Sequence, residues 1–522
     1  MTVAVAAPNR RAVTAAADVA AAGGTAVDAA VAAMVVAMST EPGVVSPLGG
    51  AYVTVWPEGE DPVVVDGNVA MPGKGVPAER FGQGLLEVTT SYGGGITLYA
   101  GAGSVAVPGG MAALGVAQER YGRVPWREVI APAVAVTRDG YELGAAAASY
   151  LALTGQPLFG WDPDTNALLN RADGSARAAG DVIVDDNLST ALARIAEEGF
   201  EDLYRGELAR RISDDVSRRG GLLSYEDLAT YVPMVRTPLR FPLGDWDLAT
   251  NPPPSIGGPV LAVMLSQLAR RDGWTVDDLM EVQRLVLGYR LQVHDFSTDL
   301  ETDGYALLER VERHGLVGLP TSSSTAHVSV VDERGTACAI TASSGYSSGQ
   351  TVPGTGLMLN NCLGEPELNR LGLHSLEPGT RLASNMAPTT ARHPSGAALA
   401  IGSPGADRIT TALLQVLGRF CLQGVDLQTA IARHRLHVSF SGGAPILGPD
   451  GAEASDPSHP TPVVQYERDP DIAAAVERVG LESIVHPSVS MFFGGVGAAY
   501  RHEDGSLGAA ADIRRESAIG VS

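Results

Sequence analysis

Cysteine and histidine are scarce in this sequence, and neither is arranged for a structural role. Three cysteines are present, Cys338, Cys362 and Cys421, and no C-x-x-C pair occurs. The ten histidines are scattered without the spacing of metal ligands. We therefore expect no disulfide framework, no metal site and no cofactor.

Positive charge is also scarce. Lys and Arg total 37 against 59 Asp and Glu, which gives a formal net charge of −22. Nucleic-acid grooves and anionic membrane surfaces both attract proteins that carry clustered basic residues. The composition therefore argues against both partners and favours a small-molecule substrate.

A long uncharged apolar run is missing as well. Residues 12–38 are rich in Ala, but Asp18, Asp28 and two adjacent glycines interrupt them. The N-terminus has no charged segment followed by an apolar stretch, as a signal peptide would. The sequence thus predicts no membrane span and a cytoplasmic location.

Apolar residues make up 45% of the 522 residues, which is enough for a large core. That length corresponds to roughly three domains of about 150 residues, or to one large layered fold. Helical periodicity and capping residues predict helices at the following positions: 9–22, 25–38, 109–122, 126–138, 187–219, 259–270 and 277–296. The segment NPPPSIGG at 251–258 predicts a loop, and 297–324 is less regular.

Strand patterns dominate after residue 325. AHVSVVD, the turn ERG and TACAITAS predict a hairpin, and GAALAIG predicts another strand. Two further hairpins are predicted, one from GGAYVTVWP and DPVVVDG, the other around Asp504 and Gly505. Strands in hairpins and helices in separate blocks indicate an α+β fold of antiparallel sheets covered by helices.

Two short motifs fit other kinds of catalytic or binding site only in part. GYSSG at 345–349 fits the nucleophile elbow of α/β-hydrolases, but QTVPGTG follows where that motif needs a helix. GAGSVAVPGG has a lone G-x-G outside a βαβ unit, so a dinucleotide site is not indicated. Both motifs are more typical of turns.

The hydroxyl-rich stretch TSSST at 321–325 raises a different interpretation. A threonine hydroxyl needs an adjacent base, and a free α-amine on the same residue has a pKa of about 7.7–8.0, near working pH. Cleavage between Ser324 and Thr325 would create that amine. The alternative is an ordinary Ser/Thr loop.

A second stretch, GSPGAD at 402–407, places Gly405 and Ala406 in a tight turn before a predicted helix. Backbone N–H groups at a helix N-terminus lack intrahelical partners and can stabilise an oxyanion. The alternative here is a plain strand-to-helix turn.

The sequence resembles the γ-glutamyltranspeptidase family of N-terminal nucleophile hydrolases nearly from end to end. VAAPNRRAVTAAADVAAAGGTAVDAAVAA and EPGVVSPLGGAYV look like the family's opening. GSVAVPGGMAALGVAQERYGRVPW, RIAEEGFEDLYRGELA, GGLLSYEDLATY and PPPSIGG follow in order. TAHVSVVD, LNN, SNMAPT and GSPGADRI complete the series. Six or more ordered blocks make the resemblance specific.

This resemblance implies a four-layer αββα sandwich made as one precursor. It implies self-cleavage before Thr325 into a large piece, 1–324, and a small piece, 325–522, interleaved in one domain. The two pieces would form a heterodimer, and whether it pairs further is left open.

The resemblance also implies roles for individual residues. Thr325 would be the nucleophile, and Ser343, where the family usually has Thr, would hold or tune its hydroxyl. Gly405 and Ala406 would form the oxyanion hole, although the family usually has Gly at both positions. Arg408 is interpreted as a structural ion-pair partner without a catalytic role.

The expected substrate pocket departs from the family. Pro77 stands where glutathione-using members have a carboxylate-binding arginine, and Arg80, three residues on, is a candidate replacement. Gly345 stands where an Asn helps to hold the α-amino group. Four further candidate pocket residues are Ser384, Asn385, Glu365 in place of the usual Asp, and Cys362 in place of a Gln.

The leading hypothesis is thus a self-processing threonine hydrolase or acyltransferase that cleaves an amide-like bond in a donor other than glutathione. Family branches act on small amides such as oxamate, and one cleaves a carbon–carbon bond beside a carbonyl in alkylproline biosynthesis, a step toward antibiotics. That reaction is the first alternative. The others are true γ-glutamyl transfer or glutathione hydrolysis, and a non-catalytic binding relative.

Overall fold

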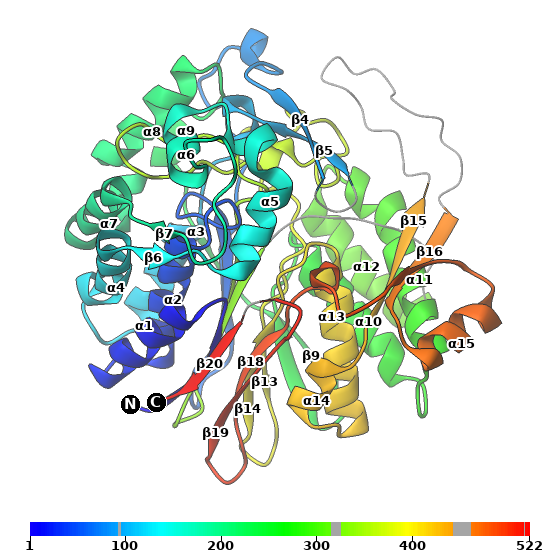
Figure 1. Ribbon diagram of the computed structural model, residues 1–522. Helices are drawn as coiled ribbons and strands as arrows, with labels where there is room; N and C mark the ends of the chain where they lie inside the picture. Colours follow the sequence, from blue (N-terminus) through cyan, green and yellow to red (C-terminus); the bar gives the residue numbers. More distant parts are fainter. Residues whose placement is uncertain (92–94, 315–324, 442–460, 516) are drawn as a thin grey trace.

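The structure is a computed structural model that describes residues 1–91, 95–314, 325–441, 461–515 and 517–522. Two antiparallel sheets lie face to face at its centre, with helices outside each of them (Figure 1). The first sheet has the strand order β20-β1-β11-β12-β2-β3-β8. Its strands in chain order are β1 Val3–Ala7, β2 Gly50–Trp56, β3 Val63–Gly67, β8 Met234–Arg236, β11 Ala326–Asp332, β12 Ala337–Ser343 and β20 Ala518–Val521.

The second sheet has the order β19-β18-β14-β13-β10-β9. Its strands are β9 Leu239–Leu243, β10 Trp246–Thr250, β13 Thr389–Arg392, β14 Ala398–Gly402, β18 Gly497–Arg501 and β19 Leu507–Ala511. The predicted hairpins β2–β3, β11–β12 and β18–β19 all form. Their turns contain glycines in the left-handed region, among them Gly335 with φ +94° and Gly505 with φ +87°.

Small side chains fill the space between the two sheets. Ala4 and Ala339 of the first sheet pack with Ala400 and Ala499 of the second in one buried cluster. Because facing side chains set the separation of stacked sheets, alanines let these two approach closely. The elevated alanine content of the chain thus has a packing role at its centre.

Four helices lie on the outer side of the first sheet and pack against it or against one another. They are α1 Arg10–Ala21, α2 Ala26–Thr40, α3 Gly110–Tyr121 and α4 Trp126–Asp139. Every residue of α2 is buried, which explains why this segment is apolar all round without spanning a membrane. Thr25 caps it as predicted, in a capping box with Asp28. Among the described residues, no helix is both long and apolar enough to cross a membrane.

The second sheet is covered by α10 Gly257–Ala269, α11 Val276–Gln292 and α13 Arg408–Leu417, which share its apolar core. The layers are therefore helix, sheet, sheet, helix, as expected. The structure differs from the predicted elements in two of the segments named above. The segment 187–219 is broken at Gly199 into α7 Asp186–Glu198 and α8 Glu207–Arg218, and the irregular segment after 297 contains α12 Leu300–His314.

The remaining elements surround this sandwich. They are β4 Leu86–Thr90, β5 Ile96–Ala100, β6 Tyr141–Glu142, β7 Val182–Ile183, α5 Ala145–Phe159, α6 Pro163–Leu169, α9 Tyr225–Ala229, α14 Leu427–Ala432, β15 Leu436–Ser441, β16 Thr461–Glu467, α15 Pro470–Val479 and β17 Glu482–His486. Single turns of tighter or wider helix are η1 Ala78–Arg80, η3 Ala102–Ser104, η4 Phe200–Leu203, η5 His294–Phe296, η6 Cys362–Gly364, η7 Gly418–Leu422 and η8 Met491–Phe493.

Segments from both sides of residue 325 contribute to each sheet. In the first sheet β11 and β12 lie between β1 and β2, and in the second β10 pairs with β13. β1 also pairs with β20, so the two chain ends lie side by side (Figure 1). A break before Thr325 would therefore leave two pieces joined by hydrogen-bonded strands.

Candidate active site

Thr325 lies immediately before β11 and is 3% exposed. Ala326 pairs with Ala342 in the antiparallel ladder between β11 and β12. The next position of that register places Thr325 opposite Ser343, the last residue of β12. Residues in this relation have Cβ atoms about 4.5–5.5 Å apart, so two hydroxyl side chains meet at the end of the hairpin.

A small cavity opens beside this pair of hydroxyls, and we call it the polar cavity. Thr325 and Ser343 line it together with Asn68, Val69, Cys362, Glu365, Leu368, Ala383, Ser384, Asn385 and Met386. Its volume is about 20 Å³, room for roughly one water molecule. The fold thus brings together six residues that the sequence nominated from four separate segments.

Ser384 and Asn385 are fixed by neighbours that the sequence did not single out. The carbonyl oxygen of Ser384 accepts hydrogen bonds from the N–H groups of Ile256 and Gly257, at 3.0 Å each. Arg290 on α11 donates to Oδ1 of Asn385 and forms a buried 3.0 Å ion pair with Asp295. The proline-rich loop before α10 and the arginine on α11 therefore hold this wall of the polar cavity.

Cys362 and Glu365 form the opposite wall. Burial and the nearby Glu365 carboxylate raise the pKa of the Cys362 thiol well above its ordinary value, so the side chain remains a neutral thiol. Gly345, with φ +64°, lies against this wall. A Cβ at that position would be 2.3 Å from Oδ1 of Asn361 and 2.9 Å from Oε1 of Glu365. The backbone position that replaces the family's Asn consequently has no room for a side chain.

The turn at 403–407 contains two consecutive residues with positive φ. Gly405 has φ +124° and Ala406 has φ +67°, and neither N–H donates a hydrogen bond to any residue that the structure describes. Pro404 lines a second cavity together with Thr325, so the turn approaches the nucleophile candidate. Two unengaged donors beside a hydroxyl can stabilise the oxyanion of an attacked carbonyl.

Charged side chains hold the turn at 403–407 in place. Asp407 forms a buried ion pair with Arg408, and Nε2 of His437 lies 3.2 Å from Oδ2 of the same carboxylate. Burial acts to raise the pKa of Asp407, but Arg408 and His437 outweigh it and lower the pKa. Arg408 also donates to the carbonyl oxygen of Phe492 at 3.0 Å, which fits its interpretation as a structural ion-pair partner.

Arg80 lies outside the polar cavity. It ends η1 and donates from Nη2 to the carbonyl oxygen of Ser217 at 3.2 Å. It is not among the residues that line either cavity at Thr325. Ser324, on the other side of the expected cleavage site, lies outside the described residues.

His327 is a residue near the nucleophile candidate that sequence reasoning did not select. It lies two positions after Thr325 on the same face of β11, with its ring nitrogens 2.8 Å from Oγ1 of Thr341 and 2.7 Å from Oγ of Ser329. Burial lowers its pKa to about 3, so the ring is neutral. Its place two residues after Thr325, on the same face as that hydroxyl, was the available signal.

Among the described residues, no group of three or more His, Cys, Asp or Glu is placed to hold a metal ion. The arrangement consists instead of hydroxyls, an unengaged pair of N–H groups and a buried polar wall. Such a set can perform nucleophilic acyl transfer.

Comparisons with solved structures agree with the layers described above. Cephalosporin acylase from Bacillus halodurans superposes with a TM-score of 0.80 at 23% identity, covering 99% of this chain and 95% of that one. The LmbA2991HD structure gives a TM-score of 0.79 at 23% identity, covering 99% and 98%. At this identity the likeness establishes the fold, an αββα N-terminal nucleophile hydrolase sandwich.

Sequence comparisons reach further. Glutathione hydrolase 5 proenzyme of Mus musculus is 29% identical over 469 residues, 80% of this chain and 78% of the relative. Glutathione hydrolase proenzyme of Pseudomonas aeruginosa is 28% identical, covering 85% and 86%. Acylase ACY 1 proenzyme of Pseudomonas sp. (strain V22) is 28% identical, covering 80% and 78%. The profile described as Gamma-glutamyltranspeptidase matches residues 12–522, and the chain therefore belongs to the γ-glutamyltranspeptidase family of enzymes.

Proposed function

We propose that this protein is a self-processing threonine hydrolase or acyltransferase that acts on an amide-like donor other than glutathione. The observation that carries the proposal is the meeting of Thr325, Ser343 and the polar cavity at the end of the β11–β12 hairpin. The proenzyme relatives support self-processing, and the acylase relative supports a wider range of amide donors.

In the processing step, Oγ1 of Thr325 attacks the carbonyl carbon of Ser324. The C–N bond of that peptide breaks, an ester forms, and the Thr325 nitrogen takes up a proton to become a free amine. Water then hydrolyses the ester and leaves Ser324 with a terminal carboxylate. The products are the fragments 1–324 and 325–522, held together by the shared sheets.

In turnover, the new α-amine accepts the hydroxyl proton while Oγ1 attacks the donor carbonyl. The N–H groups of Gly405 and Ala406 stabilise the negative oxygen of the tetrahedral intermediate. The leaving group departs with a proton from the ammonium, and Thr325 carries the acyl group as an ester. Water or an amine then releases the acyl group.

Two features of the polar cavity argue against a γ-glutamyl donor. Arg80, the nominated carboxylate anchor, is engaged with Ser217 outside the cavity. Gly345 replaces the Asn that helps to hold an α-amino group, and its surroundings leave no space for a longer side chain. A glutamyl headgroup would therefore lose charge-assisted contacts of about 1.5–3 kcal/mol each.

Denaturing electrophoresis and mass analysis of the purified protein test the processing step. We expect two fragments separated between 324 and 325, and a single intact chain for Thr325→Ala. Thr325→Ser is the matched control, because it retains a hydroxyl and should still process. An intact wild-type chain that nevertheless binds small molecules would support the non-catalytic alternative.

A substrate screen on the processed protein tests the donor. It compares γ-glutamyl anilides, short oxo-acid amides and vinylogous oxo-acids, the last of which probe carbon–carbon cleavage. We expect turnover of a non-glutamyl compound to exceed that of γ-glutamyl anilide by at least ~10-fold, the effect of about 1.4 kcal/mol. Faster γ-glutamyl turnover would contradict the proposed donor class while leaving the nucleophile in place.

A further inference from the structure

Thr325 borders two cavities, and only the polar cavity is explained by the expected acyl pocket. The second, which we call the Arg515 cavity, has a volume of about 50 Å³. Its lining combines Thr325, Ala326, His327 and Pro404 with Ala6, Ala7, Pro8, Glu41, Val44, Ala146, Tyr150, Met491, Gly495, Gly497, Arg515 and Ser517. A donor whose carbonyl is attacked by Thr325 can place one part in each cavity.

Arg515 is the only residue with a permanent positive charge in that lining. Its Nε and Nη2 atoms are buried and have no hydrogen-bond partner, and no described carboxylate forms an ion pair with it. The chain has 22 more acidic than basic residues, yet no carboxylate that the structure describes pairs with this guanidinium. Buried polar atoms normally have a partner, so these two nitrogens point to an anionic group of a ligand.

The position of Arg515 is fixed by the same loops that carry the unengaged N–H groups. Its aliphatic stem lies over Gly495, where a Cβ would be 2.8 Å from Cδ. The N–H of Gly495 donates to Oγ of Ser403 at 3.1 Å, one residue before Pro404. Arg515 is therefore connected, through Gly495 and Ser403, to the turn that approaches Thr325.

The remaining lining constrains the ligand. Glu41, the acidic residue of the cavity, accepts a 2.7 Å hydrogen bond from Nδ2 of Asn9 and repels an anion from its own side. Ala6, Ala7, Val44 and Met491 contribute apolar surface to the same cavity. A ligand group that fits has a short apolar stem and a carboxylate directed at Arg515.

We propose that the Arg515 cavity binds a carboxylate on the leaving-group side of the donor, which rests on the proposed acyl-transfer function of Thr325. The substrate class is then an amide or vinylogous oxo-acid whose departing part is itself a small carboxylic acid. The acyl part then lies on the side of the polar cavity, and Arg515 orients the departing part.

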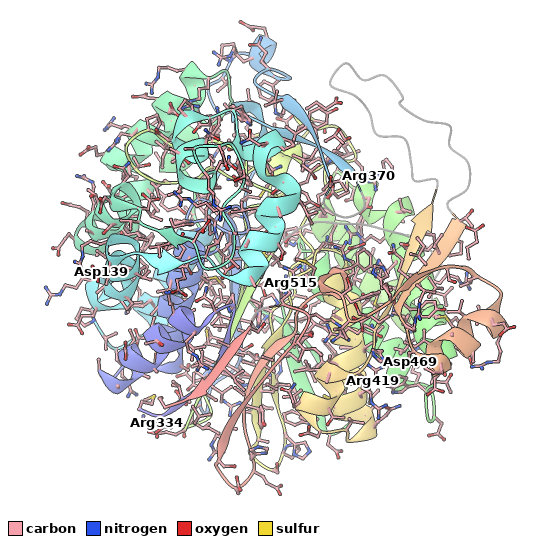
Figure 2. All side chains as sticks on the ribbon, in the orientation of Figure 1. Asp139, Arg334, Arg370, Arg419, Asp469 and Arg515 are labelled. Carbon is pink, nitrogen blue, oxygen red and sulfur yellow. The ribbon has the colours of Figure 1, made fainter. Side chains whose placement is uncertain are left out.

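Two other arginines resemble Arg515 in one respect. Arg370 and Arg419 also have a buried nitrogen without a hydrogen-bond partner. Neither lines a cavity with Thr325, and Figure 2 shows both on the opposite side of the molecule from α1–α4. Arg515 lies near the centre of the same view.

The binding test uses propionate and its neutral counterpart propionamide, titrated by ligand-observed NMR into the full-length protein as purified. We expect Arg515→Met to weaken propionate binding roughly 10- to 100-fold, the value of a charge-assisted contact, and to leave propionamide unchanged. Arg515→Lys should retain part of the affinity. Gly495→Ala, which displaces the stem, should weaken propionate binding without removing a charge.

Arg334→Met is the matched control, because it removes the same charge from an exposed arginine at the lower edge of the molecule (Figure 2). Equal propionate affinity in wild type and Arg515→Met would overturn the inference, as would no propionate binding to wild type. Cleavage into two fragments shows that each variant has folded.

A kinetic test follows with amides that share one acyl group and depart as either 3-aminopropionate or propylamine. We expect wild type to prefer the carboxylate-bearing amide in kcat/KM by ~10-fold or more, and Arg515→Met to lose that preference. If no fragments form and no amide is turned over, the proposed function fails, and the propionate titration alone still decides the role of Arg515.

Discussion

The two walls of the site at Thr325 are built in different ways. The hairpin wall consists of Thr325, immediately before β11, and Ser343, the last residue of β12; the ladder between these strands is continuous from Ala326 to Val331. The loop wall, residues 362–365, 384–386 and 403–407, has little regular structure and is held by individual side chains such as Arg290 and Asp407. One wall is fixed by many shared hydrogen bonds, the other by a few separate contacts.

This difference means that substitutions can alter the lining of the cavity while the position of Thr325 stays the same. A one-residue slip in the hairpin would turn every side chain to the other face of a buried sheet, so the position of Thr325 is strongly determined. The loop wall depends on single residues in unusual conformations, such as Gly405 and Ala406. Substitutions there can reshape the cavity without moving the hydroxyl.

The largest effect is expected from Gly405→Ala in the loop wall. A Cβ at this position would be 2.7 Å from the Cα of Gly494, and φ is +124°, which L residues other than Gly rarely adopt. The turn must move, and with it the N–H groups that we propose to stabilise the oxyanion. We expect kcat to fall about 10²- to 10³-fold, measured on whichever amide the wild type turns over.

Gly396→Ala is the control for this change. Gly396 has φ +92° and nothing within 4 Å of a built Cβ, so the substitution has the backbone cost without the collision. If Gly396→Ala and Gly405→Ala reduce kcat equally, the turn at 405 has no special role.

The next effect concerns acid stability of the hairpin wall through His327. Its folded pKa of about 3 lies below the ordinary value of 6.5, because burial disfavours the charged ring. Folding therefore favours the neutral form, and the associated stability is complete above pH 6.5. It is lost as pH falls from 6.5 toward 3, by roughly 1.4 kcal/mol per pH unit.

Urea unfolding of wild type and His327→Gln at pH 7, 5.5 and 4.5 measures this slope. We expect the free energy of unfolding to fall less steeply with acid in His327→Gln than in wild type. His502→Gln, at an exposed position, should follow the wild-type slope. Parallel slopes for wild type and His327→Gln would show that His327 binds protons equally in the folded and unfolded states.

The contrast between the hairpin wall and the loop wall also determines which residues could be predicted from the sequence. Period-two patterns located β11 and β12, and hydroxyls at the strand entrance pointed to Thr325, because both signals are local. The wall made by Ser384, Cys362 and Glu365 was nominated through family resemblance. Arg290 and Arg515 gave no local signal at all, since tertiary folding alone brings α11 and the C-terminal segment to the site. The break at Gly199 and helix α12 were missed for a related reason, because packing overrode weak periodicity.

A smaller effect is expected from Ser343→Ala in the hairpin wall. Ser343 lies opposite Thr325, and its Oγ accepts a 3.1 Å hydrogen bond from the N–H of Gly345. Loss of this hydroxyl removes a neighbour of the nucleophile and a tie to the Gly345 turn. We expect kcat/KM to fall about 10-fold, the effect of one ordinary hydrogen bond of ~1 kcal/mol or slightly more. Ser343→Thr, which restores the family's usual residue, should retain most activity; equal losses in both variants would point to packing instead.

The smallest effect is expected from Ala406→Gly. Ala406 has φ +67°, which costs an L residue about 1–2 kcal/mol, whereas glycine adopts it freely but loses ~0.5–1 kcal/mol in backbone entropy on folding. The two terms nearly cancel, so the free energy of unfolding should rise by no more than ~1 kcal/mol, measured by urea denaturation. The N–H keeps its direction, and kcat should stay within about 3-fold of wild type. Because Gly405→Ala and Ala406→Gly are opposite exchanges at adjacent positions, their expected outcomes separate the backbone conformation of the turn from its side-chain content. A large loss of activity in Ala406→Gly would mean that the methyl group itself contacts the substrate.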